Sequence, residues 1–128
     1  MKITQIRLEN VTNGMIVKFN SENKLEAFDN VGAVAGIATN CREVLVQNDP
    51  DQTATTEFVC ELVIAGPCDV LLDSVSSSQG TSFGASTSKA GYASINASPK
   101  IGQTSPRSWS DTTEYLPGLV PALICIDD

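Results

Sequence analysis

Histidine is absent from this chain of 128 residues. Its absence excludes Ser-His-Asp and Cys-His nucleophile pairs and the usual histidine-containing zinc sites. The four cysteines include no Cys-x-x-Cys spacing, which disfavours a cysteine-only metal site. Gly80-x-x-x-Gly84 lacks the Lys-Ser that completes a phosphate-binding loop. We therefore expect no catalytic residue, no metal site and no cofactor, and a protein that is not an enzyme.

Paired carboxylates are equally scarce. Asp69 and Asp73 lie at opposite ends of one expected strand, about 13 Å apart, which is too far for a glycosidase pair. Asp49 and Asp51 flank a proline, and a surface turn is the commoner role for such a group than a calcium site. Neither pair supports hydrolytic chemistry.

Positive charge is also in short supply. Lys and Arg total 8 against 15 Asp and Glu, charged residues make up only 18% of the chain, and the net charge is −7. Without a basic stripe to neutralise phosphates, we expect no nucleic-acid partner. A surface with so little charge is compatible with a subunit that has large interfaces.

Long apolar runs are missing as well, so we expect neither a signal peptide nor a membrane span. Synthesis in a reducing cytoplasm follows, and cysteines are then most simply small buried apolar residues. We expect four free thiols, at Cys41, Cys60, Cys68 and Cys125.

Alternating apolar residues and turn residues fill the chain instead. The central stretch, Phe58–Asp73, consists of two apolar segments separated by Gly66-Pro67, which predicts a tight hairpin with Cys60 opposite Asp73. Asn13-Gly14 predicts another hairpin. Gly36, inside an apolar segment at 33–38, indicates a bulge or a close backbone approach.

No segment shows a convincing helical period over ten residues. The predicted fold class is therefore all-β, a single domain forming a small β-barrel or sandwich with little or no helix. We expect residues 1–13 to form an N-terminal strand or arm. Residues 14–128 form the barrel domain, with a long loop at 74–89 that holds one short strand near Thr81–Phe83.

The closing segment is apolar on both faces, which is typical of a strand buried on both sides. One face carries Val120, Ala122, Ile124 and Ile126, and the other carries Leu119, Leu123 and Cys125. Burial inside one barrel satisfies this pattern, and so does an interface between subunits. With the low surface charge, the pattern predicts a homotrimer whose interface includes Leu119, Leu123 and Cys125.

Several segments, taken in order, resemble small bacteriophage capsid decoration (cement) proteins with a β-barrel or β-tulip core. Their order and the matching length carry the resemblance over most of residues 14–126. The segments are Gly14–Phe19, Ala33–Ala38, Ala65–Asp73, Lys89–Ala93, Ile101–Gln103 and Leu119–Ile124.

The resemblance implies a non-enzymatic virion protein that trimerises on the outer surface of the head, after assembly in the host cytoplasm. Its partner is then the major capsid protein, which it clamps against internal pressure through many repeated contacts. Ile3, Ile6 and Leu8 are the predicted capsid contact, because an apolar N-terminal strand at a sheet edge invites strand addition. Completing the barrel is the alternative role for this segment. The alternative function is a tail or baseplate module that contacts a receptor or carbohydrate.

Overall fold

The computed structural model describes residues 2–47, 49–73, 80–105 and 118–126. These residues form β-strands and no helix, so the all-β prediction is confirmed. No helix among them is long and apolar enough to cross a membrane. The strands are β1 (Lys2–Ile6), β2 (Ile16–Phe19), β3 (Leu25–Ala27), β4 (Gly36–Val46), β5 (Thr55–Val63), β6 (Ala65–Leu72), β7 (Ser82–Ala85), β8 (Ala93–Ile95), β9 (Gly102–Thr104) and β10 (Gly118–Cys125).

Strands β1 to β5 form an antiparallel sheet in the order β1-β5-β4-β2-β3, which we call the N-terminal sheet. Its two edge strands approach each other, because an isolated bridge joins Arg7 to Leu25 and the Leu8 amide donates to the Leu25 carbonyl at 2.8 Å. Alternate residues of its strands, such as Val17, Cys60 and Leu62, pack into a core of their own.

Strands β6 to β10 close into a barrel in the order β10-β6-β8-β7-β9. The longest pairing in the barrel is between β10 and β6, from Gly118↔Leu72 to Cys125↔Ala65. Phe83 fills the interior and is fully buried. The short strand predicted within 74–89 is β7, while residues 74–79 lie outside the described part of the chain.

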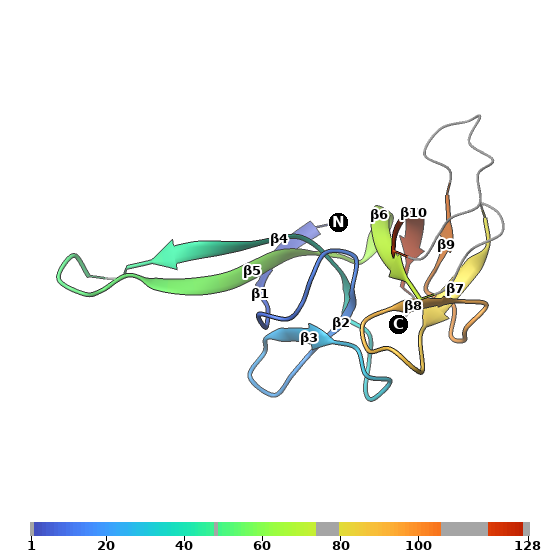
Figure 1. The fold of residues 1–128 in the computed structure, drawn as a ribbon, viewed down its shortest axis with the longest axis horizontal. Coiled ribbons are helices and arrows are strands. Elements are labelled where there is room, and N and C mark those ends of the chain that lie inside the picture. Colours follow the sequence, from blue (N-terminus) through green and yellow to red (C-terminus); the bar gives the residue numbers. More distant parts are fainter. Residues whose placement is uncertain (1, 48, 74–79, 106–117, 127–128) are drawn as a thin grey trace.

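The two sheets lie next to each other along the long axis (Figure 1), and they share core residues and backbone hydrogen bonds. Gly14 stands at their junction: its amide donates to Ala38 of β4 at 2.7 Å, and its carbonyl accepts from Leu71 of β6 at 2.9 Å. Its φ of +87° suits glycine, and a Cβ there would lie 2.4 Å from Leu119 Cδ2. Ile16 likewise packs in the barrel core although β2 belongs to the N-terminal sheet.

The hairpin predicted at Gly66-Pro67 is wrong. The chain leaves the N-terminal sheet at Ile64, and both residues lie within β6, paired to β10. Strand β6 pairs with β8 only at Leu72, so one edge of its first half has no strand beside it in the described residues. Proline, which has no N–H to donate to a ladder, is tolerated at such an edge. Cys60 therefore lies opposite Gln5 of β1 rather than opposite Asp73.

The hairpin predicted at Asn13-Gly14 is also wrong, because β1 pairs with β5 and not with β2. The prediction for Gly36 is confirmed: a Cβ there would lie 2.6 Å from the Val63 carbonyl oxygen. The ladder between β4 and β5 is irregular between Thr39 and Arg42, a few residues further along.

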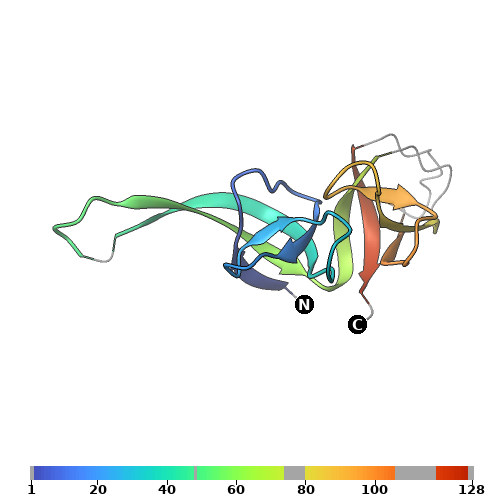
Figure 2. The same ribbon diagram turned by 90° about the horizontal axis from the view of Figure 1, so that it is seen from below.

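One hairpin projects from the body (Figures 1 and 2). Strand β1 covers β5 only from Val59 to Val63, and β2 covers β4 only at Gly36 and Ile37. Beyond these residues β4 and β5 pair only with each other, up to Val46↔Thr55. We call the outer part, residues 43–47 and 49–57, the β4–β5 arm.

Candidate functional site

The outer face of β10 is the first candidate surface. Val120, Ala122 and Ile124 point into the barrel and are buried, while Leu119, Leu123 and Cys125 point outward. The predicted division of the strand into two faces is therefore confirmed. The prediction that both faces are buried is wrong for the single chain, because Leu119 and Leu123 are each 43% exposed.

This surface continues across the ladder onto β6, because residues paired across an antiparallel ladder share a face. Leu123 pairs with Pro67, and Cys125 pairs with Ala65, which are both exposed. We call these four residues, together with Leu119, the β10 face. It presents aliphatic side chains, a proline ring and a thiol to solvent, and the exposed Asp69 carboxylate, paired with Pro121, lies among them on the same face.

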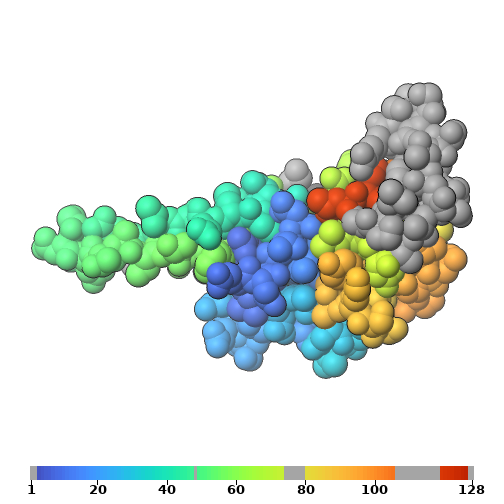
Figure 3. Space-filling model, viewed as in Figure 1, coloured from blue at the N-terminus to red at the C-terminus, as the bar shows by residue number. Residues whose placement is uncertain are grey.

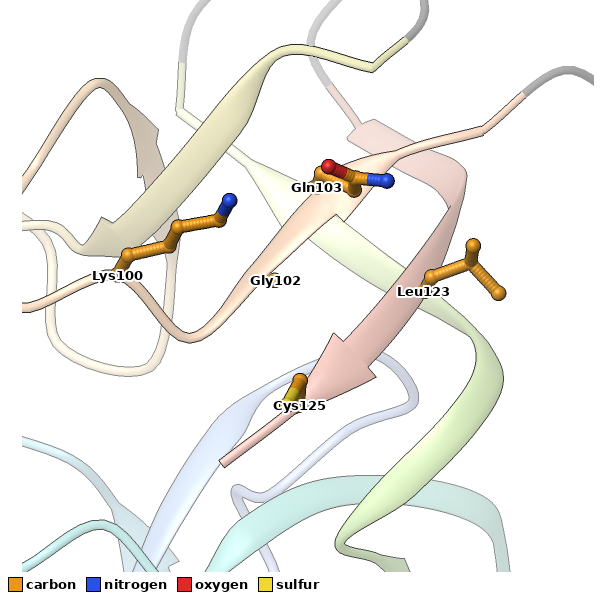
Figure 4. Close-up of a pocket in the computed structure, with 5 residues that line it drawn as sticks. All are labelled: Lys100, Gly102, Gln103, Leu123 and Cys125. Carbon is orange, nitrogen blue, oxygen red and sulfur yellow. The ribbon is translucent and has the colours of Figure 1, made fainter. Parts of the chain in front are cut away.

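A groove of about 500 Å³ borders the β10 face (Figure 4). We call it the β9–β10 groove; it is lined by Lys100, Gly102, Gln103, Leu123 and Cys125. Gly102 is required there, because a Cβ would lie 2.6 Å from the Leu123 carbonyl oxygen and 2.7 Å from the Phe83 ring. Any larger residue would push β9 away from β10.

Lys100 supplies the positive charge of this groove. It also lines a second hollow of about 740 Å³, bordered by Phe28, Val34 and Ile126. The described residues offer it no carboxylate in salt-bridge range. By contrast, Lys18 contacts Asp29 at 2.7 Å, which raises the pKa of the lysine and lowers that of the carboxyl group through their hydrogen bond.

The predicted capsid-contact residues lie along β1 and just after it. Ile3 is 42% exposed and Ile6 is 40% exposed, on opposite faces of the strand. Leu8 is half-buried and packs against the core of the N-terminal sheet. The structure therefore leaves two of the three side chains accessible and does not gather the three into one surface.

Arg7, for which no role was predicted, anchors this segment. Its side chain is only 8% exposed and donates to backbone carbonyls alone. Nε bonds Val59 at 2.9 Å, Nη2 bonds Arg42 at 3.2 Å, and Nη1 bonds Val11 at 3.0 Å and also reaches Leu8 and Glu9. The guanidinium also lies 5.3 Å from the centre of the Phe58 ring.

The arrangement of Arg7 has a sequence signature. In the alternation of the first strand it has the same parity as Ile3 and Gln5, and these residues pair with the buried face of β5. A cation with inward parity predicts a buried group that needs several acceptors. Strand β1 therefore belongs to the N-terminal sheet, whereas the alternative role was to complete the barrel, which strands β6 to β10 form here.

The β4–β5 arm is the second candidate surface (Figure 3). Leu45 near its end is 77% exposed, the most exposed large apolar residue among those described. On the opposite face of the ribbon, Val44 and Val46 are partly exposed. The arm thus carries apolar side chains on both faces with no third strand beside it in the described residues.

The thiols differ in their surroundings. All four cysteines are free, with Cys60 buried, Cys41 and Cys68 partly exposed, and Cys125 exposed. Burial raises the pKa of the Cys41 thiol and raises that of Cys60 to about 11. No group of three or more Cys, Asp or Glu side chains in the described ranges could hold a metal ion.

Comparisons with known proteins add nothing to this geometry. No family model, no curated protein and no solved structure matches the chain. Any conclusion about function must therefore start from the two exposed apolar surfaces and the resemblance in the order of the strand segments.

Proposed function

We propose that this protein is a non-enzymatic virion protein that binds the outside of a bacteriophage head as a homotrimer and stabilises the capsid. Its partner is the major capsid protein. The bacteriophage setting rests on the resemblance of the strand segments to capsid decoration proteins. The observation that carries the proposal is the exposed β10 face.

The physical argument concerns solvent exposure. Apolar side chains that project outward from a closed barrel are not buried in its core. Their burial against another subunit would stabilise the association by roughly 25 cal/mol per Å² of apolar surface removed from water. Leu119 and Leu123 lie on one strand and the exposed Pro67 and Ala65 on its neighbour. Exposed apolar side chains gathered in this way around a single carboxylate, Asp69, favour an interaction site.

Resistance to capsid expansion does not require a strong single contact. Contacts of modest affinity, repeated over the shell and linked through a trimer, act together because the second contact is intramolecular. A protein that holds neighbouring capsid subunits in this way needs rigid β structure and accessible apolar surfaces rather than a reactive group.

The trimer is tested by sedimentation equilibrium. We expect the wild-type protein to form trimers and Leu123→Asp to shift it to monomer. The matched control is Phe19→Asp, because Phe19 is 44% exposed but lies on β2 of the N-terminal sheet. A monomer at high micromolar concentration, or equal loss of trimer in both variants, contradicts the role of the β10 face.

The location is tested by immunogold labelling of purified virions. Label spread over the head supports capsid decoration. Label at one vertex or along the tail contradicts it and favours a tail or baseplate module that contacts a receptor or carbohydrate.

A further inference from the structure

We propose that the β4–β5 arm of one copy packs into the β9–β10 groove of a second copy, so that the trimer closes head to tail. This inference rests on the proposed homotrimer and names the surfaces that hold it together. The observations behind it are the unsupported arm, its distance from the groove in the same chain, and their opposite charges.

The arm requires a partner for physical reasons. A two-stranded ribbon without a third strand or a core is marginally stable in water. Beyond the residues that β1, Arg7 and β2 cover, the ladder from Val44↔Glu57 to Val46↔Thr55 has no other strand beside it in the described residues. Leu45 is 77% exposed on one face, and Val44 and Val46 lie on the other. A second surface that covers one face would stabilise the ribbon.

The β9–β10 groove that covers the arm cannot belong to the same copy. The arm extends to one end of the long axis of the molecule, and β9 and β10 lie toward the other end (Figures 1 and 2). The arm can therefore reach a β9–β10 groove only on a neighbouring molecule.

The charges of the two surfaces are complementary. The described residues of the arm carry four carboxylates and no lysine or arginine: Glu43, Asp49, Asp51 and Glu57. The groove contains Lys100, which has no carboxylate in salt-bridge range within its own chain's described residues. Its walls include Leu123 and Cys125, which offer apolar surface to Leu45. Opposite charges around an apolar contact favour the correct pairing and speed association.

Symmetry also favours this contact for a trimer. An isologous contact, in which two β10 faces meet across a two-fold axis, produces a dimer and leaves both arms uncovered. An arm in a groove joins two different surfaces, and such a heterologous contact forms a ring when its rotation closes. Each copy then donates one arm and accepts one.

The first test is cross-linking between Leu45→Cys and the native Cys125. Treatment of the Leu45→Cys variant with a short bismaleimide, followed by mass spectrometry of peptides, should identify a bridge between residue 45 of one copy and Cys125 of another. Mixing isotope-labelled and unlabelled protein distinguishes this bridge from one within a chain. Adding Cys125→Ser should abolish it, and Phe19→Cys should not form an equivalent bridge to Cys125.

The outcomes separate the inference from the proposed function. A trimer in sedimentation equilibrium without a 45–125 bridge overturns the arm-in-groove contact and leaves the trimer standing. A bridge of equal yield from Phe19→Cys also overturns it. A protein that stays monomeric overturns both the proposed trimer and the arm-in-groove contact.

The second test reverses the charge in the groove. Lys100→Glu should weaken trimer association by about tenfold or more, because it places a carboxylate against an acidic arm. Introducing Glu43→Lys, on the same face of the ribbon as Leu45, into Lys100→Glu should recover part of the loss, whereas Glu57→Lys, on the opposite face, should recover less. The control is Lys24→Glu, an exposed lysine of the N-terminal sheet region. Equal weakening by Lys24→Glu and Lys100→Glu contradicts the inference.

Discussion

The N-terminal sheet and the barrel close by different means. The barrel closes through backbone pairing in the order β10-β6-β8-β7-β9, around an apolar interior, and β6 meets β8 only at Leu72↔Ala93. The N-terminal sheet closes through a single bridge at Arg7↔Leu25 and through the Arg7 guanidinium, which ties the segment after β1 to β4 and β5. Each region thus closes at one narrow backbone contact, which a buried cation supports in the sheet and the apolar packing of Leu72 and Ala93 supports in the barrel.

The two regions also differ in what they expose. The barrel presents a broad apolar face on β10 and β6, while the N-terminal sheet extends two of its strands into the β4–β5 arm. One region therefore offers a receiving surface and the other a projecting one. Variants that separate fold stability from association can test whether this division is real.

The largest expected effect concerns Arg7. Arg7→Met should lower the free energy of unfolding by about 3 kcal/mol or more, because it leaves buried carbonyls such as those of Val59 and Val11 without a donor. Arg7→Lys should recover only part of the loss, since lysine lacks the fork of donors. Urea unfolding followed by circular dichroism measures both.

Arg42→Met is the matched control for Arg7. The Arg42 guanidinium donates to the carbonyl of Asn40 at 3.0 Å in an exposed setting, so its loss should change the free energy of unfolding by no more than about 0.5 kcal/mol. Similar values for the two methionine variants would show that the sheet does not depend on the buried guanidinium.

The second prediction concerns Gly14, where the two regions meet. Gly14→Ala should destabilise the protein by about 2–3 kcal/mol, since it combines a positive φ with a Cβ placed 2.4 Å from Leu119 Cδ2 and 3.0 Å from the Leu71 nitrogen. Gly32→Ala has nearly the same φ, +84°, and open space around the Cβ, so it should cost only about 1 kcal/mol. Thermal unfolding of both variants separates backbone strain from collision at the junction.

The sequence was sufficient for the fold class and for the two faces of the last strand, β10. The alternation of Val120, Ala122 and Ile124 with Leu119, Leu123 and Cys125 is a local pattern with period two, and the structure follows it. The special role of Gly36 also followed from a local rule, since glycine in a strand indicates close approach.

Strand pairing was not predictable in the same way. Gly66-Pro67 and Asn13-Gly14 have the composition of turns, but which strands pair depends on contacts between distant segments. Here β5 pairs with β1 and β4, and β6 pairs with β10, so the chain crosses between sheets at Ile64. The arm could not be anticipated either, because its exposure results from where β1 and β2 end rather than from its own residues.

The smallest expected effect concerns the buried thiol of the N-terminal sheet, Cys60, and its contribution to the free energy of unfolding as the pH rises. The exposed thiol of the barrel, Cys125, is the comparison in a measurement of reactivity. Burial, reinforced by the neighbouring Cys41, raises the pKa of Cys60 in the N-terminal sheet from 9.0 to about 11. Between these values the unfolded chain loses the proton while the folded chain keeps it, so folding stability is complete below pH 9 and declines as the pH approaches 11. The loss should be on the order of 1–2 kcal/mol. Accordingly, the difference in unfolding free energy between the wild type and Cys60→Ala should shift by that amount over this range. At pH 8 a disulfide reagent such as DTNB should modify Cys125 in the folded protein and Cys60 only after unfolding, because exposure and thiolate content govern the rate. Rapid modification of Cys60 in the folded state would mean that the core of the N-terminal sheet opens readily, and that the bonds of Arg7 do not keep it closed.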